Sequence, residues 1–320
     1  MDLLSDILSH MKLQGTLYFR TSFTGKWGVK VPAFGRVARF HFAHRGRCMV
    51  KIECSNDTIA LEQGDLLIVP RGAAHKLFSD AGSESCAAEL DTVLQDSGFE
   101  GTGTLVYGEP GDDHETQLIC GHFSFTDSIN HPLIEQLPAY ILLRNYGEIS
   151  GAWMEQTLRV IGKEAGTEEI GSSIISLKLS EIIFVQALRA YLSETDNVVP
   201  GLRGFADKRI AKSLQAIHLN PDSNWTLEEL ASVAGMSRTA YTGLFGKLMN
   251  MTPLKYVTQW RMQVAREKLL ESNSAIIRIA EATGYQSEAA FSRVFKKYFD
   301  LTPAAYRRQH RVNRQLGPEL

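Results

Sequence analysis

The feature that most constrains this sequence is a unit of about fifty residues that occurs twice toward its C-terminal end. Leu230-Ala231 and Gly235 in the first copy match Ile279-Ala280 and Gly284 in the second at an offset of 49 residues. After the glycine the offset is 50, and the matching pairs are Phe245 with Phe295, Thr252-Pro253 with Thr302-Pro303, and Tyr256 with Tyr306. The second copy therefore has one more residue in its turn. Such a duplication predicts two copies of one supersecondary structure.

Each copy has the pattern of a helix, a turn and a second helix. Apolar residues recur at helical spacing before Gly235 and Gly284, and each glycine suits the left-handed conformation that ends a helix. Ser237 offers a side-chain oxygen that can cap the second helix of the first copy. The second helices have apolar stripes made of Tyr241, Leu244, Phe245 and Leu248 in one copy and Phe291, Val294, Phe295 and Tyr298 in the other.

A Thr-Pro pair follows each of these helices, at Thr252-Pro253 and at Thr302-Pro303. Threonine can cap a helix, and proline suits the first helical position. Apolar stripes alone would also fit two ordinary helical hairpins. The repeated glycine turn and the repeated Thr-Pro pair favour two helix-turn-helix units instead.

Charge is divided unevenly along the 320 residues, although the net charge is only −2. From Phe205 onward there are 17 Lys and Arg against 10 Asp and Glu, whereas the first 204 residues have 17 against 26. A basic region joined to an acidic one indicates a polyanionic partner for the basic region alone.

The segments WTLEELASVAGMS, IIRIAEATGYQSEAAFSRVFKKYF and LTPAAYRR resemble the AraC/XylS family of bacterial regulators over roughly Asp207 to Arg308. The resemblance implies two helix-turn-helix units joined by one long helix, here about Leu254 to Leu270. Their second helices would enter successive major grooves of double-stranded DNA. The family's usual glycine before the last Thr-Pro pair is replaced by Asp300, with Asn250 near the corresponding place in the first copy. Both residue types tolerate the left-handed conformation.

The predicted DNA-facing surface lies opposite the apolar stripes. In the second copy Arg293 can contact a guanine edge, and Lys296 or Lys297 can contact phosphate. In the first copy Gly243 and Gly246 leave no long donor on that surface, so this helix should read fewer bases. The predicted DNA-binding residues are Ser237, Arg238, Thr239, Thr242, Lys247, Gln286, Ser287, Glu288, Ser292, Arg293, Lys296 and Lys297.

Residues from about Tyr18 to Phe125 are short apolar runs separated by Gly, Pro and Asn, which is typical of a β-sandwich or β-barrel. Within them, GDLLIVPRGAAH at Gly64–His75 resembles the second motif of cupins. This resemblance implies a cupin-like barrel that senses a chemical signal. Asp80–Thr116, which includes Cys86, has little apolar pattern, and a stretch of that length is expected to be disordered or functional. Cys86 is expected to be an exposed, inert thiol because its neighbours are acidic, with oxidant sensing as the alternative.

The interior of the predicted barrel is the expected effector site. His41 and His44 point to opposite sides of a strand, so His41 and His75 are the histidines expected to converge. Cys48 and His122 are their expected neighbours. Two ligands make a poor metal site, so no catalytic residue, metal or cofactor is expected. A transition metal bound by His41 and His75 is the alternative, as is a wholly structural role for His75.

Between the barrel and the basic region, helices are expected over Trp153–Ala165 and Ile170–Ser193. The second of these is apolar on two faces, which favours burial of one face against a second subunit. The expected domains are 1–150 (cupin-like barrel), 151–203 (helical connector and linker), 204–310 (twin helix-turn-helix domain) and 311–320 (tail).

The sequence therefore predicts a multidomain α+β protein: a ligand-responsive, DNA-binding transcription regulator acting in the cytoplasm, without a membrane segment. Its expected partners are an operator in double-stranded DNA, an unidentified small-molecule effector and a second copy of the chain, with RNA polymerase as a further candidate. The alternative is a cupin enzyme, a metal-dependent isomerase or oxygenase, fused to a DNA-binding domain. Neither the effector nor the direction of regulation follows from the sequence.

Overall fold

The computed structural model describes residues 3–315 except 12, 36, 54, 56, 102, 109–114, 126–131, 145–155, 158–159, 161–163, 165–168, 194–198 and 200. The chain forms two compact units. One, the sandwich unit, comprises Met11–Ile129 and Leu137–Asn197. The other, the helical unit, comprises Met1–His10, Asn130–Gln136 and Val198–Leu320. The helix expected over Trp153–Ala165 lies largely outside the described residues.

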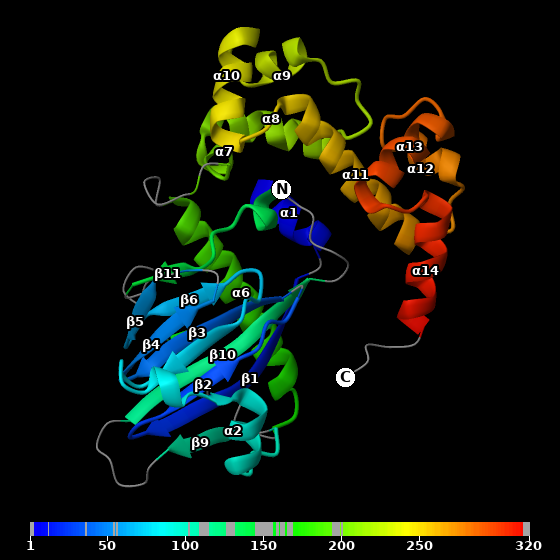
Figure 1. The fold of residues 1–320 in the computed structure, drawn as a ribbon. Helices are drawn as coiled ribbons and strands as arrows, with labels where there is room; N and C mark the ends of the chain where they lie inside the picture. The colour runs from blue at the N-terminus through cyan, green and yellow to red at the C-terminus, as the bar shows by residue number, and fades with distance from the viewer. Residues whose placement is uncertain are drawn as a thin grey trace. The chain divides into compact units, whose positions relative to one another are not determined.

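The sandwich unit is built from eleven described strands and two α-helices (Figure 1). The strands are β1 (Leu13–Thr24), β2 (Gly28–Val31), β3 (Val37–Arg45), β4 (Arg47–Ile52), β5 (Thr58–Glu62), β6 (Leu66–Val69), β7 (His75–Phe78), β8 (Ala88–Glu89), β9 (Thr104–Gly108), β10 (Glu115–Phe125) and β11 (Ile141–Leu143). The helices are α2 (Leu90–Asp96) and α6 (Ser172–Ser193), with a 3-10 turn at Glu84–Cys86.

These strands form two sheets whose orders are β11-β6-β3-β10-β1-β9 and β5-β4-β7-β2-β8. No described strand of one sheet is hydrogen-bonded to a strand of the other, so the predicted cupin-like β domain has two facing sheets in place of one closed barrel. In β3 and β10 the antiparallel register places His41 opposite Cys120 and Arg39 opposite His122. Alternation along each strand sends these side chains to the same side of the sheet.

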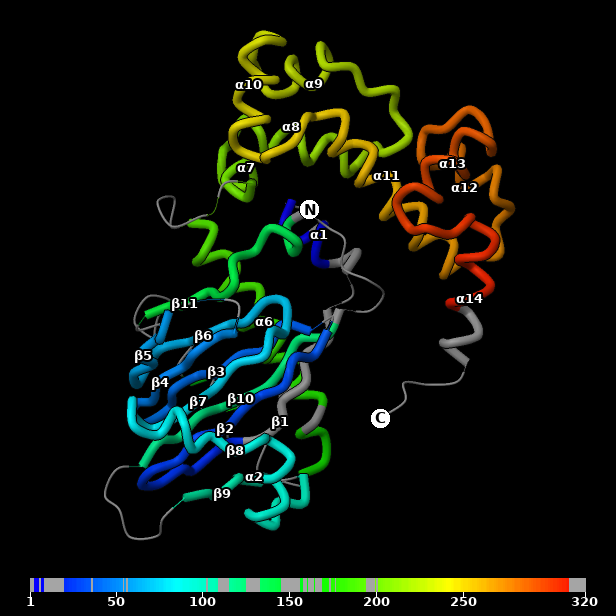
Figure 2. Tube along the Cα trace, in the orientation of Figure 1, coloured from blue at the N-terminus to red at the C-terminus, as the bar shows by residue number. Residues whose placement is uncertain are grey.

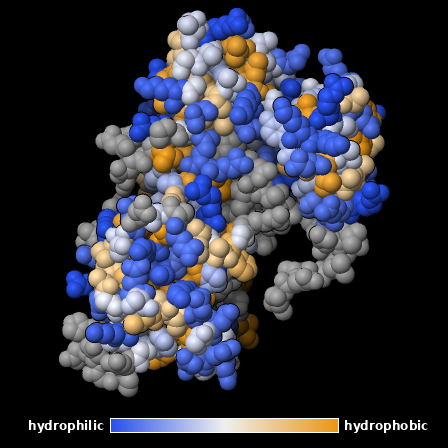
Figure 3. Space-filling model, in the orientation of Figure 1, coloured by the Kyte–Doolittle hydropathy of each residue, from blue (hydrophilic) through white to orange (hydrophobic). Residues whose placement is uncertain are grey.

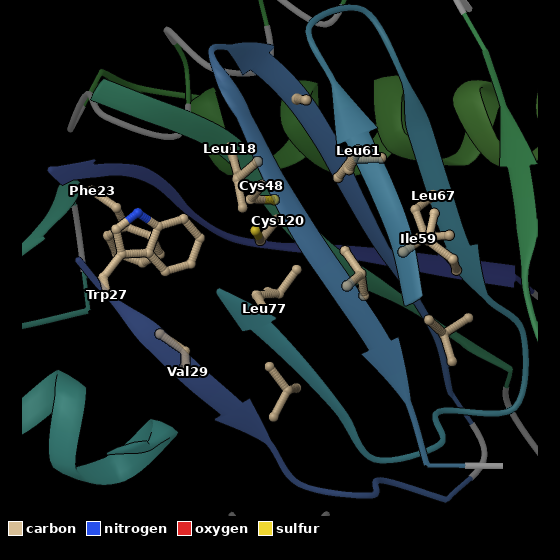
Figure 4. Close-up of a cluster of buried hydrophobic side chains, with 14 of the residues drawn as sticks. Phe23, Trp27, Val29, Cys48, Ile59, Leu61, Leu67, Leu77, Leu118 and Cys120 are labelled. Carbon is tan, nitrogen blue, oxygen red and sulfur yellow. The ribbon is translucent and has the colours of Figure 1, made fainter. Parts of the chain in front are cut away.

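A hydrophobic core to which both sheets contribute lies between them (Figure 4). Val50 and Leu77 come from one sheet and Leu67 and Leu118 from the other, and all four are buried. The opposite face of the six-stranded sheet is covered by α6, where Phe184 packs against Phe123 of β10 with ring centroids 4.8 Å apart. A sheet that is apolar on both faces in this way is covered on both.

The structure corrects the expectation of disorder over Asp80–Thr116. Described residues there form the 3-10 turn, β8, α2 and β9, and Val93 and Leu105 enter the core between the sheets. Their side chains are too few and too far apart in sequence to produce a periodic pattern. As expected, Cys86 is exposed.

The helical unit contains the duplicated segment (Figure 2). Its helices are α1 (Leu3–Met11), α3 (Pro132–Glu135), α7 (Arg203–Ala206), α8 (Lys208–Leu219), α9 (Leu227–Val233), α10 (Arg238–Met249), α11 (Pro253–Glu271), α12 (Ile276–Glu281), α13 (Glu288–Phe299) and α14 (Pro303–Gln315). The two helix-turn-helix pairs are α9 with α10 and α12 with α13, as the duplication predicts.

The helix ends lie where the cap residues predict them. Ser237 and Ser287 cap α10 and α13, and Thr252 caps α11 with Pro253 in its first turn. The left-handed residues predicted after α10 and α13 are confirmed at Asn250 and Asp300, which have φ angles of 53° and 58°.

Each helix-turn-helix pair has its own hydrophobic core, and α11 takes part in both. Tyr256 and Trp260 of α11 pack with the first pair, whereas Leu269 and Leu270 pack with the second. The long joining helix predicted over Leu254–Leu270 is therefore confirmed, and it serves as a structural member of both cores. Among the described residues, no helix is long and apolar enough to cross a membrane.

Candidate nucleic-acid interface and sandwich interior

The predicted DNA-facing residues of the first copy are held on α10 by several local contacts. Ser237 is the helix cap, and its hydroxyl accepts a hydrogen bond from the Ala240 amide at 3.4 Å. Arg238 forms an ion pair with Glu228 at 2.8 Å, and the Thr242 hydroxyl donates to the Arg238 carbonyl at 2.9 Å. Three of the predicted DNA-binding residues thus already have partners within the protein.

The remaining surface of α10 is open. Thr239 and Lys247 are exposed, and a Cβ atom added at Gly243 or Gly246 would meet nothing within 4 Å. No close contact with another part of the protein therefore requires glycine at these two positions. The two glycines leave a flat strip of helix backbone whose only long cationic side chain, apart from the paired Arg238, is Lys247.

The second copy presents more charge. Arg293, Lys296 and Lys297 are exposed on α13, and no ion pair engages any of them in the part of the chain that the structure describes. Ser287 caps the helix through the Ala290 amide at 3.2 Å, and Ser292 is half-buried. Gln286 and Glu288 are exposed at the start of α13.

This surface has the chemistry of a nucleic-acid interface. Hydrophilic side chains, with a few hydrophobic ones among them, cover the visible face over α12 and α13 (Figure 3). Guanidinium and ammonium groups that have no internal partner can contact base edges and phosphates. The predicted residues of α13 thus lie together on one exposed surface of one helix.

In the sandwich interior His41 and His75 converge as predicted. Their Nε2 atoms are 2.8 Å apart, and both side chains are buried. The Nδ1 atom of His41 is 3.1 Å from the Cys120 Sγ, and the Nδ1 atom of His75 is 2.8 Å from the Ala73 carbonyl oxygen. These three contacts form one chain, from Cys120 through His41 and His75 to Ala73.

The Ala73 carbonyl fixes the direction of this chain when both imidazoles are neutral. A carbonyl oxygen only accepts, so Nδ1 of His75 carries a proton and its Nε2 is an acceptor. His41 must then donate from Nε2 and accept at Nδ1, which leaves the Cys120 thiol as the donor at the far end. Every hydrogen bond of the chain is satisfied in this arrangement.

Burial favours the neutral forms. It lowers the pKa of His41 well below its usual value, with smaller contributions from the neighbouring His75 and Arg39. Burial also lowers the pKa of His75 to about 4 and outweighs the opposing effect of the Ala73 hydrogen bond. The pKa of His122 is likewise lowered to about 4 by burial and by Arg39.

Cys120 and Arg39 are the interior residues that the sequence prediction missed. Cys48 was expected beside the histidines, but the sulfur hydrogen-bonded to His41 is that of Cys120, directly opposite it on β10. Cys48 and Cys120 both lie in the core between the sheets (Figure 4), and burial raises the pKa of Cys48 to about 12. The pairing of β3 with β10 decides which cysteine is adjacent, and no local pattern encodes that register.

Within the described residues no group of three or more His, Cys, Asp and Glu side chains has the geometry of a metal site. The two converging Nε2 atoms would supply two ligands at most. The other ring nitrogen of each histidine already has a hydrogen-bond partner, as the ring nitrogens of metal-bound histidines usually do.

Comparison with known families gives a match to each part of the chain. A cupin family model matches residues 2–193, and a helix-turn-helix domain model matches residues 230–309. The first match covers the strands and α6, and the second covers most of the duplicated segment.

Curated relatives match over nearly their whole length. The transcriptional regulator AlkR of Acinetobacter baylyi is 29% identical over 97% of this chain and 100% of its own. An AraC-like transcription regulator of Streptomyces antibioticus is 29% identical over 96% of this chain and 99% of its own. The RCS-specific transcriptional activator RclR of Escherichia coli is 24% identical over 99% and 100%. Among solved structures, the DNA-binding domain of AdpA in complex with a target DNA matches 35% of this chain and 99% of its own, at 27% identity and a TM-score of 0.33.

Proposed function

Because the chain belongs to the AraC-type transcriptional regulators that have an N-terminal cupin domain, and is thus a DNA-binding regulator, we propose that α10 and α13 read its operator under the control of a ligand bound between the two sheets. The observation that carries the DNA-reading part is the set Arg293, Lys296 and Lys297, exposed on the second helix of a helix-turn-helix pair and without an ion-pair partner among the described residues. The DNA contacts are the residues predicted above, with Arg293 at a base edge and the lysines at phosphates.

The effector site belongs between the sheets, next to His41 and His75. Leaving a buried polar group without a hydrogen-bond partner costs free energy. A ligand that displaces the present partners of His41 and His75 must therefore supply hydrogen bonds of its own, which makes binding specific. A ligand that exchanges hydrogen bonds with these imidazoles would alter the packing of β3, β7 and β10 together. It can shift the protein toward a DNA-binding state only by its difference in affinity for the two states.

The active form is a dimer that assembles through α6. One face of this helix packs on the six-stranded sheet, while Ile174, Ile175 and Ile182 on another face have 52%, 42% and 43% of their surface exposed. Apolar residues at helical spacing on an exposed surface are typical of a helix–helix interface. RNA polymerase would be contacted by the same regulator at its promoters.

A cupin enzyme remains the second candidate, carried by the convergence of the His41 and His75 Nε2 atoms at 2.8 Å. It requires a transition metal with further ligands, and we propose that the protein has neither a catalytic residue nor a resident cofactor. Element analysis of the purified chain separates the two functions. A stoichiometric transition metal that is lost in His75→Ala would favour the enzyme.

The regulator function is tested by selecting DNA from a genomic library with the full-length chain. Affinity for the selected operator should fall steeply with salt, by about 0.9 logarithmic units per phosphate contact for each ten-fold rise in salt. With an effector in hand, His75→Ala should remove the response to the effector and leave operator binding intact. Failure to enrich any DNA, or binding independent of salt, would contradict the function.

A further inference from the structure

The side chain of Arg261 contacts both helix-turn-helix copies and so connects them in addition to the backbone of α11. It lies in the middle of α11, and its guanidinium donates from Nε to the Pro221 carbonyl at 2.7 Å and from Nη2 to the Ser223 carbonyl at 2.8 Å. Both carbonyls belong to the loop between α8 and α9 in the first copy. Two hydrogen bonds from a single planar cation fix the orientation of that loop relative to α11 as well as its distance from α11.

The same guanidinium lies against the turn of the second copy. Its central carbon is 5.7 Å from the centre of the Tyr285 ring, within the range of a cation–π contact. A Cβ atom built on Gly284 would be 2.5 Å from the Nη2 atom of Arg261 and 2.9 Å from the Asp222 carbonyl oxygen. The two copies therefore meet here with a backbone turn pressed against the arginine.

The corresponding glycine of the first copy shows that this contact is not a general property of the turn. Gly235 and Gly284 occupy equivalent positions and have similar φ angles of +67° and +77°. A Cβ atom added at Gly235 would meet nothing within 4 Å, whereas one at Gly284 would collide with Arg261. Backbone conformation therefore requires glycine at both positions, and close approach requires it only at Gly284.

The contacts of Arg261 matter because α11 alone would be a flexible connection between the two helix-turn-helix copies. Long helices bend, and a bend or a twist in α11 would change the separation and rotation of α10 relative to α13. On DNA, one base pair more between the half-sites shifts the second half-site by about 3.4 Å and turns it by about 35°. A protein whose two helix-turn-helix copies are rigidly joined therefore accepts only one spacing between the half-sites.

We propose that Arg261, held by the Pro221 and Ser223 carbonyls and seated against Gly284 and Tyr285, is a positioning residue that sets the spacing between the two DNA half-sites. It acts without touching DNA. The inference rests on the DNA-binding function and adds to it the residue that determines which operator spacing is accepted.

The test uses the full-length chain and the operator that it selects, together with versions that have one base pair added or removed between the half-sites. Wild-type protein should bind the altered spacings much more weakly than the selected one. Arg261→Ala loses both hydrogen bonds, so this penalty should shrink by at least about ten-fold, the change expected from a single hydrogen bond made by a charged donor. Arg261→Lys, which can reach only one carbonyl at a time, should give an intermediate penalty.

Two matched controls separate positioning from stability. Arg307 also donates to two carbonyls, those of Leu269 at 3.2 Å and Ser274 at 2.7 Å, but both lie within the second copy. Arg307→Ala should therefore weaken binding to every spacing equally. Gly284→Ala should relax the spacing preference, whereas Gly235→Ala, with the same backbone strain, should preserve it.

An unchanged penalty, within about two-fold, in both Arg261→Ala and Gly284→Ala would overturn the proposal. If Arg261→Ala does not fold, Arg261→Lys and Gly284→Ala decide the matter by the same ratio. A wild-type chain that selects no DNA would contradict the regulator function itself, which is a different result from an operator bound with unchanged spacing preference.

Discussion

The chain of hydrogen bonds from Cys120 through His41 and His75 to Ala73 is satisfied with both imidazoles neutral, so it needs no buried charge. Protonation of His75 would reverse the central hydrogen bond, because its Nε2 would then donate to His41, and the Nδ1 proton of His41 would face the Cys120 sulfur, a weak acceptor. The charge itself would be buried away from water, which is costly. The two histidines therefore make the sandwich unit sensitive to acid.

The direction of that sensitivity follows from the pKa of His75, which is about 4 in the folded protein against 6.5 for an unperturbed imidazole. Between these values the unfolded state binds a proton that the folded state does not. The contribution of His75 to the free energy of unfolding should then be constant above pH 6.5 and fall by about 1.4 kcal/mol per pH unit as pH is lowered toward 4. His41 and His122, whose pKa values burial also lowers, add to the fall in the same direction. Chemical denaturation of the full chain at several pH values measures this slope.

His75→Asn is the matched variant for this prediction, because an asparagine amide can still donate to the Ala73 carbonyl but does not titrate. Its slope between pH 6.5 and 4 should be smaller than that of the wild-type protein by about one proton. Equal slopes for the two proteins would mean that His75 is protonated in the folded state.

At the scale of elements, the two DNA-reading helices differ although their cores match. Phe245 and Phe295 occupy equivalent buried positions, yet α13 has exposed Arg293 where α10 has Gly243. Two glycines in the interior of α10 cost about 2 kcal/mol relative to alanine. Since neither glycine is needed for packing, α10 provides backbone approach and hydroxyl groups but few long donors.

Because α13 has more long donor side chains than α10, we expect substitutions on α13 to weaken operator binding more. Arg293→Ala should weaken operator binding by about 1–3 kcal/mol and relax the preference at one base position. Thr242→Ala should cost less, because the Thr242 hydroxyl already donates to the Arg238 carbonyl within its own helix. An operator in which every base pair is substituted in turn, bound by wild type and both variants, measures both effects. If the half-site under α10 proves the more sequence-demanding one, the predicted asymmetry is wrong.

These elements also show how far a sequence can be interpreted by itself. Local signals predicted the helix-turn-helix pairs, the caps at Ser237 and Thr252 and the left-handed Asn250, because each depends on neighbours within four residues. Of the contacts between distant segments discussed above, the convergence of His41 with His75 was predicted, with the help of the cupin-like motif that ends at His75, and the others were not. The hydrogen bond from Cys120 to His41 depends on the β3–β10 register, and the contact of Arg261 with Gly284 depends on how the two copies meet.

At the scale of the whole molecule, sequence order and compact units do not coincide. Met1–His10 and Asn130–Gln136 belong to the helical unit, although both precede the α6 helix of the sandwich unit. Leu3 of α1 packs against the core of the first helix-turn-helix copy. The N-terminal segment is therefore a part of the helical unit that no repeat or composition change in the sequence indicates.

The proposed dimer can be tested on the exposed face of α6. Ile174, Ile175 and Ile182 are each about half exposed, so complete burial by a second copy would contribute about 0.7–1.5 kcal/mol per side chain. Ile182→Glu would place a carboxylate in that interface, where burial without a partner is costly. We expect this variant to dimerise about a hundred-fold more weakly than wild type in sedimentation equilibrium and to lose affinity for operators with two sites. Ser193→Glu, an exposed position at the end of the same helix, should leave the dimer unchanged. A wild-type chain that stays monomeric at micromolar concentration, or an Ile182→Glu variant that dimerises normally, would show that α6 has another role.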